Sequence, residues 1–546
     1  MRVPSPVRRI CDGVRSAAIL LRRGLVRPLR AGESLRALRV ARRAGPFAAM
    51  IVAAAHSAPD SPAVADERGT VSYGELERLG NALARGLLET GVRAGAVVGI
   101  LCRDSRGMVL ALVAAGKLGA RVVLLNTGLA EPQLADAVRR EKVSALLLDA
   151  EFVPLTGGLP DTVPRVVTLA DGDADPGLPT VDGLVAGRST APPPLPDRPG
   201  GLVLLTSGTT GRPRGAPRDR MSPLQSAQLL DRIPLSRGGT LVLGTPLFHG
   251  TGLGQFVLAM TLGKQVVLRR RFDPEATLAA VAAHRADTLV VVPTMLGRIV
   301  DLGPAVLAGH DTSSLRVVVC GGSALPPDLC RRATEAFGDV LYNVYGSTEV
   351  ANASVATPAE LRRAPGTVGR PPVGCRLALY DERRAPVTAP GMPGTIFAST
   401  GLSFAGYTDG GTREVVDGLV STGDVGHLDA DGLLFVDGRD DEMIVSGGEN
   451  VFPAEVESLL AGHPGVRDSA VVGVDDPDFG QRLRAYVVPR PGADPGAEEL
   501  RDYVRTRLAR YKVPRDVVFV NELPRNAMGK LVRGQLDRTA PPGGVD

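Results

Sequence analysis

Short apolar segments alternate with segments of helical periodicity along most of this 546-residue chain. The alternation begins near Ser61 and runs to about Phe337, and residues 97–102 and 288–292 are two of its apolar segments. Strands that alternate with helices form parallel sheets whose two faces are covered by helices. The pattern therefore predicts an α/β fold built on parallel sheets.

Different parts of the chain differ in the secondary structure that their sequence predicts. Residues 46–438 predict one large domain, in which the parallel sheets are followed by a small β-rich subdomain where Gly and Pro interrupt short strands between residues 366 and 437. Residues 439–539 mix α and β patterns and predict a small α+β domain. Residues 1–45 form a basic extension, and the Pro- and Gly-rich residues 540–546 predict a disordered tail.

Composition limits the class of protein. Hydrophobic residues make up 44% of the chain and charged residues 22%, as in soluble globular proteins. The five cysteines are scattered without a Cys-x2-Cys pair, which argues against a disulfide framework or a zinc site and fits the reducing cytoplasm. A formal net charge of +4 over this length gives no reason to expect a nucleic-acid partner.

Positive charge is concentrated in residues 1–43, where twelve arginines accompany only Asp12 and Glu33. Apolar side chains recur there at helical spacing, opposite Arg8, Arg15 and Arg22, at positions Ile10, Val14, Ala17, Leu21 and Leu25. A basic amphipathic helix of this kind fits three arrangements. It can lie on an anionic membrane surface, pack on the main domain, or belong to a disordered arm.

Neither a signal peptide nor a membrane span is expected at this end of the chain. Residues 17–21 are followed at once by Arg22 and Arg23, and no small-residue cleavage site comes after them. Residues 44–55 are too few to cross a bilayer. We expect a cytoplasmic protein, with the inner face of the cell membrane as the alternative location.

The most distinctive loop is Thr-Ser-Gly-Thr-Thr-Gly-Arg-Pro-Arg-Gly at residues 206–215, which follows an apolar segment that predicts a buried strand. Its glycines let backbone N–H groups approach an anion, while its hydroxyls and arginines can donate to phosphate oxygens. No Gly-Lys-Ser/Thr follows Gly208 and Gly211, so the loop is not a Walker A motif. It predicts a phosphate site, or else a solvated loop, and residues 221–230 predict a helix after it.

Two further motifs follow predicted strands, where α/β folds place their clefts. Residues 246–254 carry His249 among small residues, as a base, a gate or a packed side chain. Residues 320–325 contain Gly321 and Gly322, which would let a flat ligand lie against the backbone or would form a tight turn.

Residues 342–349 predict a nucleotide site after another strand. A tyrosine such as Tyr345 can stack on a purine, Asn343 can bond the edge of the base, and Thr348 can reach a phosphate. Glu349 offers the carboxylate that Mg²⁺ prefers beside substrate phosphates. The alternative is a strand-to-helix turn with an ordinary surface glutamate.

Charged residues nearer the C-terminus complete the set of candidate site residues. The carboxylate of Asp424 can accept two hydrogen bonds from a vicinal diol and so suits a ribose, which Arg439 could also contact. Lys530 lies on a glycine turn, where a lone lysine would normally be solvated.

Together these segments resemble the motifs of the AMP-forming adenylating enzymes, the superfamily of acyl-CoA synthetases, firefly luciferase and nonribosomal peptide adenylation domains. The resemblance covers about residues 59–533 with the motifs in family order, and Arg214 replaces the usual lysine. It implies a two-step reaction: a carboxylate attacks ATP to give acyl-AMP and pyrophosphate, and a thiol then attacks the adenylate. ATP, Mg²⁺ and CoA are the implied co-substrates and cofactor, and the C-terminal domain becomes a mobile lid.

The resemblance also implies a role for each motif residue. Lys530 would be the catalytic lysine, acting with Glu349, Thr348 and His249. Mg²⁺ would be held at Glu349 and Thr206, Asp441 would be the hinge, and Gly447 and Gly448 would line the CoA tunnel. The acyl site would be formed by His249, Gly250, Gly254 and Ala324. ATP and AMP would be bound by Thr206, Ser207, Gly208, Thr209, Thr210, Gly211, Arg214, Gly321, Gly322, Ser323, Asn343, Tyr345, Gly346, Ser347, Asp424 and Arg439.

The resemblance also bears on the acid, because amino-acid adenylating relatives usually place an Asp just after the strand that corresponds to residues 240–247, where it pairs with the α-amino group. Residues 248–255 contain no carboxylate, so the resemblance implies an acid without an amino group, and small residues there leave room for a chain. The stretches at 124–128 and 447–450 look most like fatty acyl-CoA synthetases of actinobacterial type, which implies a medium- to long-chain fatty acid. The alternatives are a carrier-protein thiol as acceptor, an aryl or branched acid, and a non-catalytic binding relative. The protein would act as a monomer or a homodimer.

Overall fold

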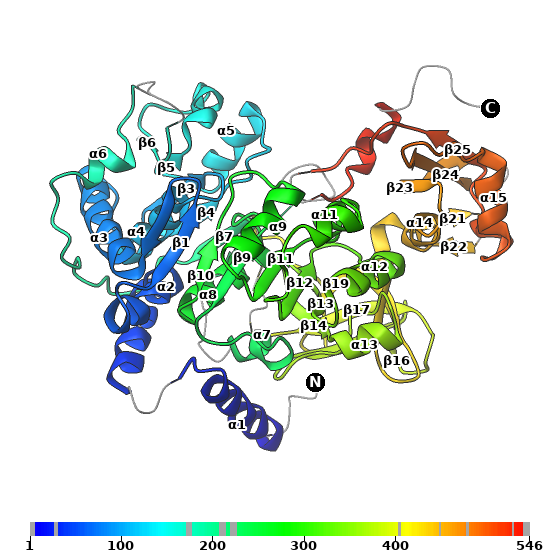
Figure 1. Cartoon of the computed structure of the whole chain (residues 1–546), viewed down its shortest axis with the longest axis horizontal. Helices are drawn as coiled ribbons and strands as arrows, with labels where there is room; N and C mark the ends of the chain where they lie inside the picture. The colour runs from blue at the N-terminus through cyan, green and yellow to red at the C-terminus, as the bar shows by residue number, and fades with distance from the viewer. Residues whose placement is uncertain are drawn as a thin grey trace.

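The computed structural model describes residues 6–26, 31–170, 177–206, 214–218, 226–401, 406–446, 449–476, 480–526 and 529–538. It confirms the expected α/β fold: two mainly parallel sheets with their helices form the large part of the molecule, and a β-rich sheet and a small C-terminal α+β unit adjoin them (Figure 1). No helix in these described ranges is both long and apolar enough to cross a bilayer.

The first parallel sheet has the strand order β6-β5-β3-β4-β7-β8. All its neighbours run parallel except β8, which pairs antiparallel with β7 at the edge. Its strands are β3 (Val97–Leu101), β4 (Arg121–Leu124), β5 (Ala145–Leu148), β6 (Arg165–Val167), β7 (Leu202–Thr206) and β8 (Arg214–Arg218). The central strands are almost wholly apolar and buried, as parallel strands covered on both faces must be.

The second parallel sheet has the order β14-β13-β12-β11-β9-β10-β1-β2, with antiparallel strands at both edges. Its strands are β1 (Pro62–Asp66), β2 (Gly69–Ser72), β9 (Thr240–Leu243), β10 (Gln265–Val267), β11 (Thr288–Val291), β12 (Val317–Gly321), β13 (Leu341–Ser347) and β14 (Ala351–Ala356). One hydrophobic cluster contains residues from both sheets. The two sheets therefore share a core.

Helices cover both sheets, and many begin at a recognisable cap. The hydroxyl of Ser72 accepts the Glu75 N–H at the start of α3, and Asp273 caps α9 in the same way. The helices are α1 (Pro6–Arg22), α2 (Ala31–Ser57), α3 (Tyr73–Glu89), α4 (Arg106–Lys117), α5 (Glu131–Arg140), α6 (Val181–Val185), α7 (Ser226–Arg232), α8 (Gly250–Thr261), α9 (Pro274–Ala283), α10 (Pro293–Val300), α11 (Pro304–Ala308), α12 (Pro327–Phe337), α13 (Pro358–Arg363), α14 (Pro453–Ala461) and α15 (Ala497–Arg505). Helix α2 packs against α3, α4 and α8, and thus fills the space between the sheets.

The β-rich sheet and the C-terminal unit complete the molecule. The former has the order β16-β15-β17-β19-β18, and β20 also pairs with β19. Its strands are β15 (Arg376–Tyr380), β16 (Pro386–Val387), β17 (Gly394–Ser399), β18 (Val415–Val416), β19 (Leu419–Leu428) and β20 (Leu434–Arg439). The C-terminal sheet comprises β21 (Ile444–Ser446), β22 (Glu449–Val451), β23 (Val466–Asp476), β24 (Gly480–Pro489) and β25 (Asp516–Phe519).

Two local details differ from the sequence pattern. Strand β8 follows the loop after β7, where no strand was expected, whereas the helix expected at 221–230 is confirmed from Ser226, with 219–225 outside the described residues. The nucleotide motif does not follow a strand: residues up to Ser347 form β13, and a tight connection leads to the antiparallel β14 and not to a helix. In each case backbone pairing at a sheet edge decides the local structure, which side-chain periodicity does not report.

Candidate active site

The candidate site residues gather where β12 and β13 end and where the β-rich sheet meets them. Gly321 lies opposite Val344 in the paired strands, and a Cβ atom at Gly321 would come within 2.6 Å of the Val344 carbonyl oxygen. Gly322 has a φ of 94°, and Ser323 and Ala324 are exposed just beyond the strand. Glycines are thus needed at this turn for close strand packing, which leaves the next residues open to a ligand.

Asp424 lies at the centre of a buried polar cluster on β19. The Tyr345 hydroxyl donates to Asp424 Oδ2 at 2.6 Å, and Arg439 donates to Oδ1 at 3.2 Å from β20, where it is the register partner of Asp424. Burial raises the pKa of Asp424, while Arg439, Tyr345 and Lys530 act in the opposite direction. The strand pairing of β19 with β20 therefore creates the Asp424–Arg439 pair that sequence spacing suggested.

Two predicted base-contacting residues already have protein partners. The Asn343 amide donates to the Thr367 carbonyl oxygen at 2.9 Å, and only 1% of the residue is exposed. The Tyr345 hydroxyl is used by Asp424, and only 9% of the residue is exposed. Asn343 thus supports the strand in this structure, while Gly346 and Ser347 at the end of β13 and Thr348 just after it are at least partly exposed.

Glu349 is a buried carboxylate with three stabilising neighbours. The Tyr407 hydroxyl donates to Glu349 Oε1 at 2.5 Å, and the Arg413 guanidinium lies 3.5 Å from the same oxygen. Burial raises the pKa of Glu349, but hydrogen bonds from Tyr407 and Ser347 and the charge of Arg413 outweigh it, so the net pKa is lowered. Glu349 is therefore an anion at neutral pH. This fits Mg²⁺, which commonly takes one or two carboxylates together with substrate phosphates.

A crossing segment, residues 406–414, connects Glu349 with the end of the phosphate loop. Its Thr408 N–H donates to the Gly215 carbonyl oxygen at 2.9 Å. Arg214, expected at the phosphates, makes two hydrogen bonds to Asp409 at 2.8 and 2.9 Å, and its guanidinium lies 3.9 Å from the centre of the Tyr407 ring. Arg214 therefore ties this segment to strand β8.

His249 is half-buried at the N-cap of α8. Burial, and secondarily the nearby charge of Lys530, lowers the pKa of His249 to about 3. Its Nε2 atom has no hydrogen-bond partner among the described residues. A neutral imidazole at this position can accept or donate one hydrogen bond, but it carries no charge at physiological pH.

The loop that carries His249 is held by a buried acid that sequence reasoning missed. Asp104, at the end of β3, accepts the Leu247 N–H at 2.9 Å, and burial raises the pKa of Asp104 to about 7. The available signal was a carboxylate placed directly after an apolar strand.

Helix α8 begins at Gly250, so the small residues of the predicted acyl segment form its first turn. Gly250 is exposed, and a Cβ atom added there would lie 3.5 Å from a side-chain carbon of Leu204. A Cβ atom added at Gly254 would touch no described residue within 4 Å. Val257 and Thr261 continue the same face and are half-buried. No described residue thus fills the space beside Gly254 on this face of α8.

Lys530 projects from the C-terminal unit toward the same cluster. Its turn is closed by Asn526, whose N–H donates to the Lys530 carbonyl oxygen at 2.9 Å and whose Oδ1 accepts the Lys530 N–H at 3.0 Å. Desolvation lowers the pKa of Lys530, although its side chain reaches solvent, and the charges of Asp424 and Glu349 partly reverse this effect. A Cβ at Gly529 would overlap Thr294 Oγ1 on α10. The C-terminal unit therefore places Lys530 within electrostatic range of Asp424, Glu349 and His249.

Several predicted site residues lie outside what the structure describes. These are Ser207, Gly208, Thr209, Thr210, Gly211, Gly447 and Gly448. The Thr206 backbone ends β7, and Asp441 lies in a short 3-10 turn directly after β20. The residues that sequence reasoning missed, Asp104, Thr294, Tyr407 and Arg413, act through contacts between segments far apart in the chain.

Comparison with known proteins points to one family. Residues 51–408 match the AMP-binding enzyme family, and residues 455–530 match the AMP-binding enzyme C-terminal domain. A feruloyl-CoA synthase of Amycolatopsis sp is 35% identical over 89% of this chain and 97% of its own. A fatty acid–[acyl-carrier-protein] ligase of Streptomyces coeruleorubidus is 31% identical over 88% and 93%. The structure of Bacillus subtilis o-succinylbenzoate CoA synthetase with its acyl-adenylate intermediate aligns with a TM-score of 0.77 at 28% identity, over 90% of this chain and 99% of that one.

Proposed function

The chain belongs to the AMP-binding enzymes, and on this premise we propose that it activates a carboxylic acid with ATP and transfers the acyl group to coenzyme A. The carboxylate oxygen attacks the α-phosphorus of ATP, which gives an acyl-adenylate and releases pyrophosphate. The thiol sulfur of CoA then attacks the acyl carbon, and AMP leaves. The position of Lys530 within electrostatic range of Asp424, Glu349 and His249 is the observation that carries this proposal.

The surroundings of Asp424, Glu349 and Lys530 suit the part that each would take in the reaction. Asp424 accepts hydrogen bonds from the ribose hydroxyls, held in place by Tyr345 and Arg439. Mg²⁺ bound at Glu349 would neutralise the charge of the ATP phosphates. The Lys530 ammonium stabilises the negative charge that develops between the carboxylate and the α-phosphate. Catalysis then consists of positioning and electrostatics, because a carboxylate needs no general base at neutral pH.

The acid is proposed to be hydrophobic and to lack an α-amino group. A medium- to long-chain fatty acid is supported by the open face of α8, where Gly250 and Gly254 leave space for a chain beside the neutral His249. An aryl acid is the second candidate, because feruloyl-CoA synthase and o-succinylbenzoate CoA synthetase are among the similar proteins. A carrier-protein thiol is the alternative acceptor, which the similar acyl-carrier-protein ligase supports.

One experiment tests these proposals together. Pyrophosphate release is measured for a panel of fatty, branched, hydroxycinnamic and benzoic acids, with CoA, with a holo carrier protein and with neither acceptor. We expect acid-dependent pyrophosphate release and rapid thioester formation with CoA. Activity with fatty acids only, or with aryl acids only, decides the substrate class. No pyrophosphate release with any acid would overturn the proposed activity.

A further inference from the structure

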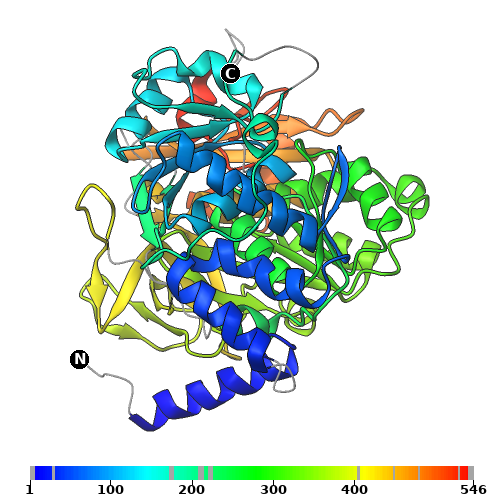
Figure 2. The same cartoon turned by 90° about the vertical axis from the view of Figure 1, so that its left-hand side faces the viewer.

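The N-terminal helix α1 is attached to the molecule by a different face from the one that its sequence pattern favours. Ile19 and Leu20 are buried, at 4% and 3% exposure, as is Ser16. The apolar stripe of the same helix points away from the molecule, with Ile10 and Val14 each 67% exposed and Leu21 46% exposed. Figure 2 shows α1 at the edge of the molecule, clear of the sheets.

This apolar surface stands out from the rest of the protein. Among the described residues, five of the eight exposed large hydrophobic side chains lie in residues 10–35. Single exposed hydrophobic residues are normal, but such a concentration marks an interaction site. The similarity to AMP-binding enzymes begins only at residue 51, so this surface lies outside the part of the chain that resembles them.

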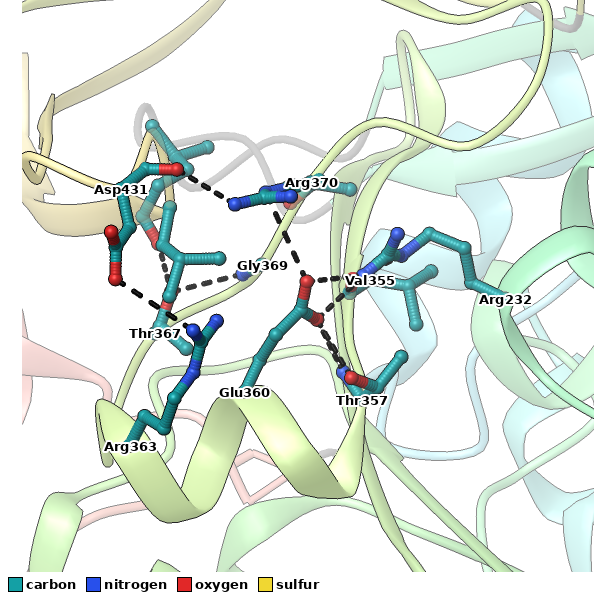
Figure 3. Close-up of polar contacts among 12 residues, drawn as sticks. Arg232, Val355, Thr357, Glu360, Arg363, Thr367, Gly369, Arg370 and Asp431 are labelled. Atoms are coloured by element: carbon teal, nitrogen blue, oxygen red, sulfur yellow. Dashed lines mark hydrogen bonds and ion pairs between the residues drawn. The ribbon is translucent and has the colours of Figure 1, made fainter.

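The attachment of α1 is firm enough to hold the stripe in one orientation. Arg15 forms an ion pair with Asp231 on α7 at 3.2 Å, and Asp231 also accepts the Val373 N–H at 2.8 Å. The next residue, Arg232, donates to Glu360 on α13 and, at 2.8 Å, to the Val355 carbonyl oxygen (Figure 3). Helix α7 is thus fixed to two other elements, and it forms a rigid support for α1.

The charge around the stripe identifies the kind of partner. On the helical wheel, Arg22 and Arg15 lie roughly a quarter of a turn beyond Val14 at the edge of the stripe, on the polar side of the helix, and both are exposed. The exposed Arg36, Arg39 and Arg42 follow on α2, and Asp12 and Glu33 are the only acids in the first 43 residues. An exposed apolar stripe on a helix whose polar side carries exposed arginines matches a bilayer interface with anionic headgroups, where the apolar side chains enter the acyl boundary and the cations contact phosphates.

We propose that the exposed face of α1, formed by Ile10, Val14, Ala17 and Leu21 with Arg15 and Arg22, docks the protein on an anionic lipid surface. The contact lies in the plane of the interface and places the enzyme where amphiphilic molecules partition. It is independent of the identity of the acid, because it uses no residue of the candidate active site.

The chain contains no tryptophan, so a single introduced tryptophan reports on this contact. Val14→Trp is compared with the matched control Met392→Trp, whose position is 55% exposed and far from α1 in sequence. With vesicles of phosphatidylcholine and phosphatidylglycerol we expect a blue shift of emission, and quenching by brominated lipid, for Val14→Trp only. Vesicles of phosphatidylcholine alone should give neither, and added salt should weaken the response.

Sedimentation with the same vesicles tests the side chains themselves. The triple variant Ile10→Ser, Val14→Ser and Leu21→Ser should bind anionic vesicles at least about tenfold more weakly than the unmodified chain. Arg22→Glu should also weaken binding, and Met392→Ser should not. All variants should keep the activity measured without vesicles. Equal binding by the triple variant, binding that ignores lipid charge, or a dimer that the triple variant abolishes would overturn the proposal.

Discussion

At the level of single residues, Glu349 shows how a buried carboxylate remains charged. Tyr407 and Arg413 reach it from the crossing segment, and they stabilise the anion in place of water. Arg413 lies 3.5 Å from the Glu349 carboxylate and is partly exposed. It can therefore move away when a cation binds Glu349. Tyr407 and Arg413 are therefore positioning residues for the proposed magnesium ligand.

Tyr407→Phe should change the pH dependence of the reaction. Without the hydrogen bond the pKa of Glu349 rises, so its anionic form is lost at a higher pH as the solution is acidified. We expect the acid limb of kcat/KM for ATP to move toward neutral pH, and the value at pH 7 to fall about threefold to tenfold, the equivalent of roughly 1 kcal/mol. Tyr380→Phe is the matched control, because Tyr380 also donates to a carboxylate, that of Asp417, at 2.9 Å. Identical profiles for the two variants would contradict this role.

Asp104 should make the protein less stable as pH rises. Burial raises the pKa of Asp104 from 3.8 to about 7, so the folded protein prefers the protonated acid. The free energy of unfolding therefore falls between about pH 4 and pH 7, and the loss is complete above the folded-state pKa. At about 1.4 kcal/mol for each pH unit, the effect is on the order of 4 kcal/mol.

Asp104→Asn should remove that pH dependence and keep the hydrogen bond, because the amide oxygen can still accept the Leu247 N–H. Urea unfolding at pH 4.5, 6 and 7.5 measures both proteins. The asparagine variant should be the more stable one at pH 7.5, and Asp104→Leu should lose activity through the displaced His249 loop. A parallel pH dependence in the unmodified and asparagine proteins would show that Asp104 is not buried as a protonated acid.

At the level of elements, helix α8 determines the space beside the reacting carboxylate. Gly254→Leu would place a side chain where no described residue lies within 4 Å of the added Cβ, one helical turn after Gly250. If a fatty acyl chain lies there, kcat/KM for long-chain acids should fall at least about tenfold, since each excluded methylene is worth about 0.8 kcal/mol. Short acids should be affected little. Gly534→Leu, at another glycine with open surroundings, is the control. An equal loss for acids of every length would place the chain elsewhere.

Elements also show which parts of the fold the sequence could predict. Buried strands such as β3 and β11 are short, mostly apolar segments, so their positions can be predicted from the local sequence. Strand β8, Arg-Gly-Ala-Pro-Arg, has no such run, and it forms because β7 offers a free edge. In α1 the periodicity predicted a helix with one apolar face, but Ile19 and Leu20 on another face make the contact with the protein. The periodicity of a helix does not specify which of its two apolar faces packs against the rest of the protein.

The candidate site residues also divide into those that the sequence could predict and those that it could not. Residues whose chemistry is local, such as Glu349 and Asp424, could be named from short motifs. Tyr407 and Arg413 could not, because they act across about 60 residues of sequence through the pairing of separate elements. Arg214 illustrates the reverse case: its motif suggested a phosphate ligand, whereas the fold supplies Asp409 as its partner.

At the level of the whole molecule, the C-terminal unit contributes one charged group to a site built by the rest. Gly529 lies so close to Thr294 that any side chain there would push the turn outward, and its φ of 70° also favours glycine. Gly529→Ala should therefore displace Lys530 from Asp424 and Glu349. We expect pyrophosphate release to fall at least about tenfold, the equivalent of about 1.4 kcal/mol, while Gly534→Ala leaves it unchanged.

The two half-reactions separate the tasks of this unit. Lys530→Ala should abolish acyl-adenylate formation and spare thioester formation from supplied acyl-adenylate, because the ammonium is needed only while charge develops at the α-phosphate. Asp441→Pro should do the opposite if the unit turns about residue 441 between the steps, because proline fixes one of the dihedrals that must change. Single-turnover assays of each half-reaction measure both variants. Equal loss of both half-reactions in Lys530→Ala would mean that one arrangement of the domains serves the entire reaction.

The alkaline limb of the pH profile adds a check on the same residue. Desolvation lowers the pKa of Lys530, so the rate of adenylation should decline below pH 10.5 as the ammonium is lost. Lys530→Arg should move that decline to higher pH, because a guanidinium stays charged.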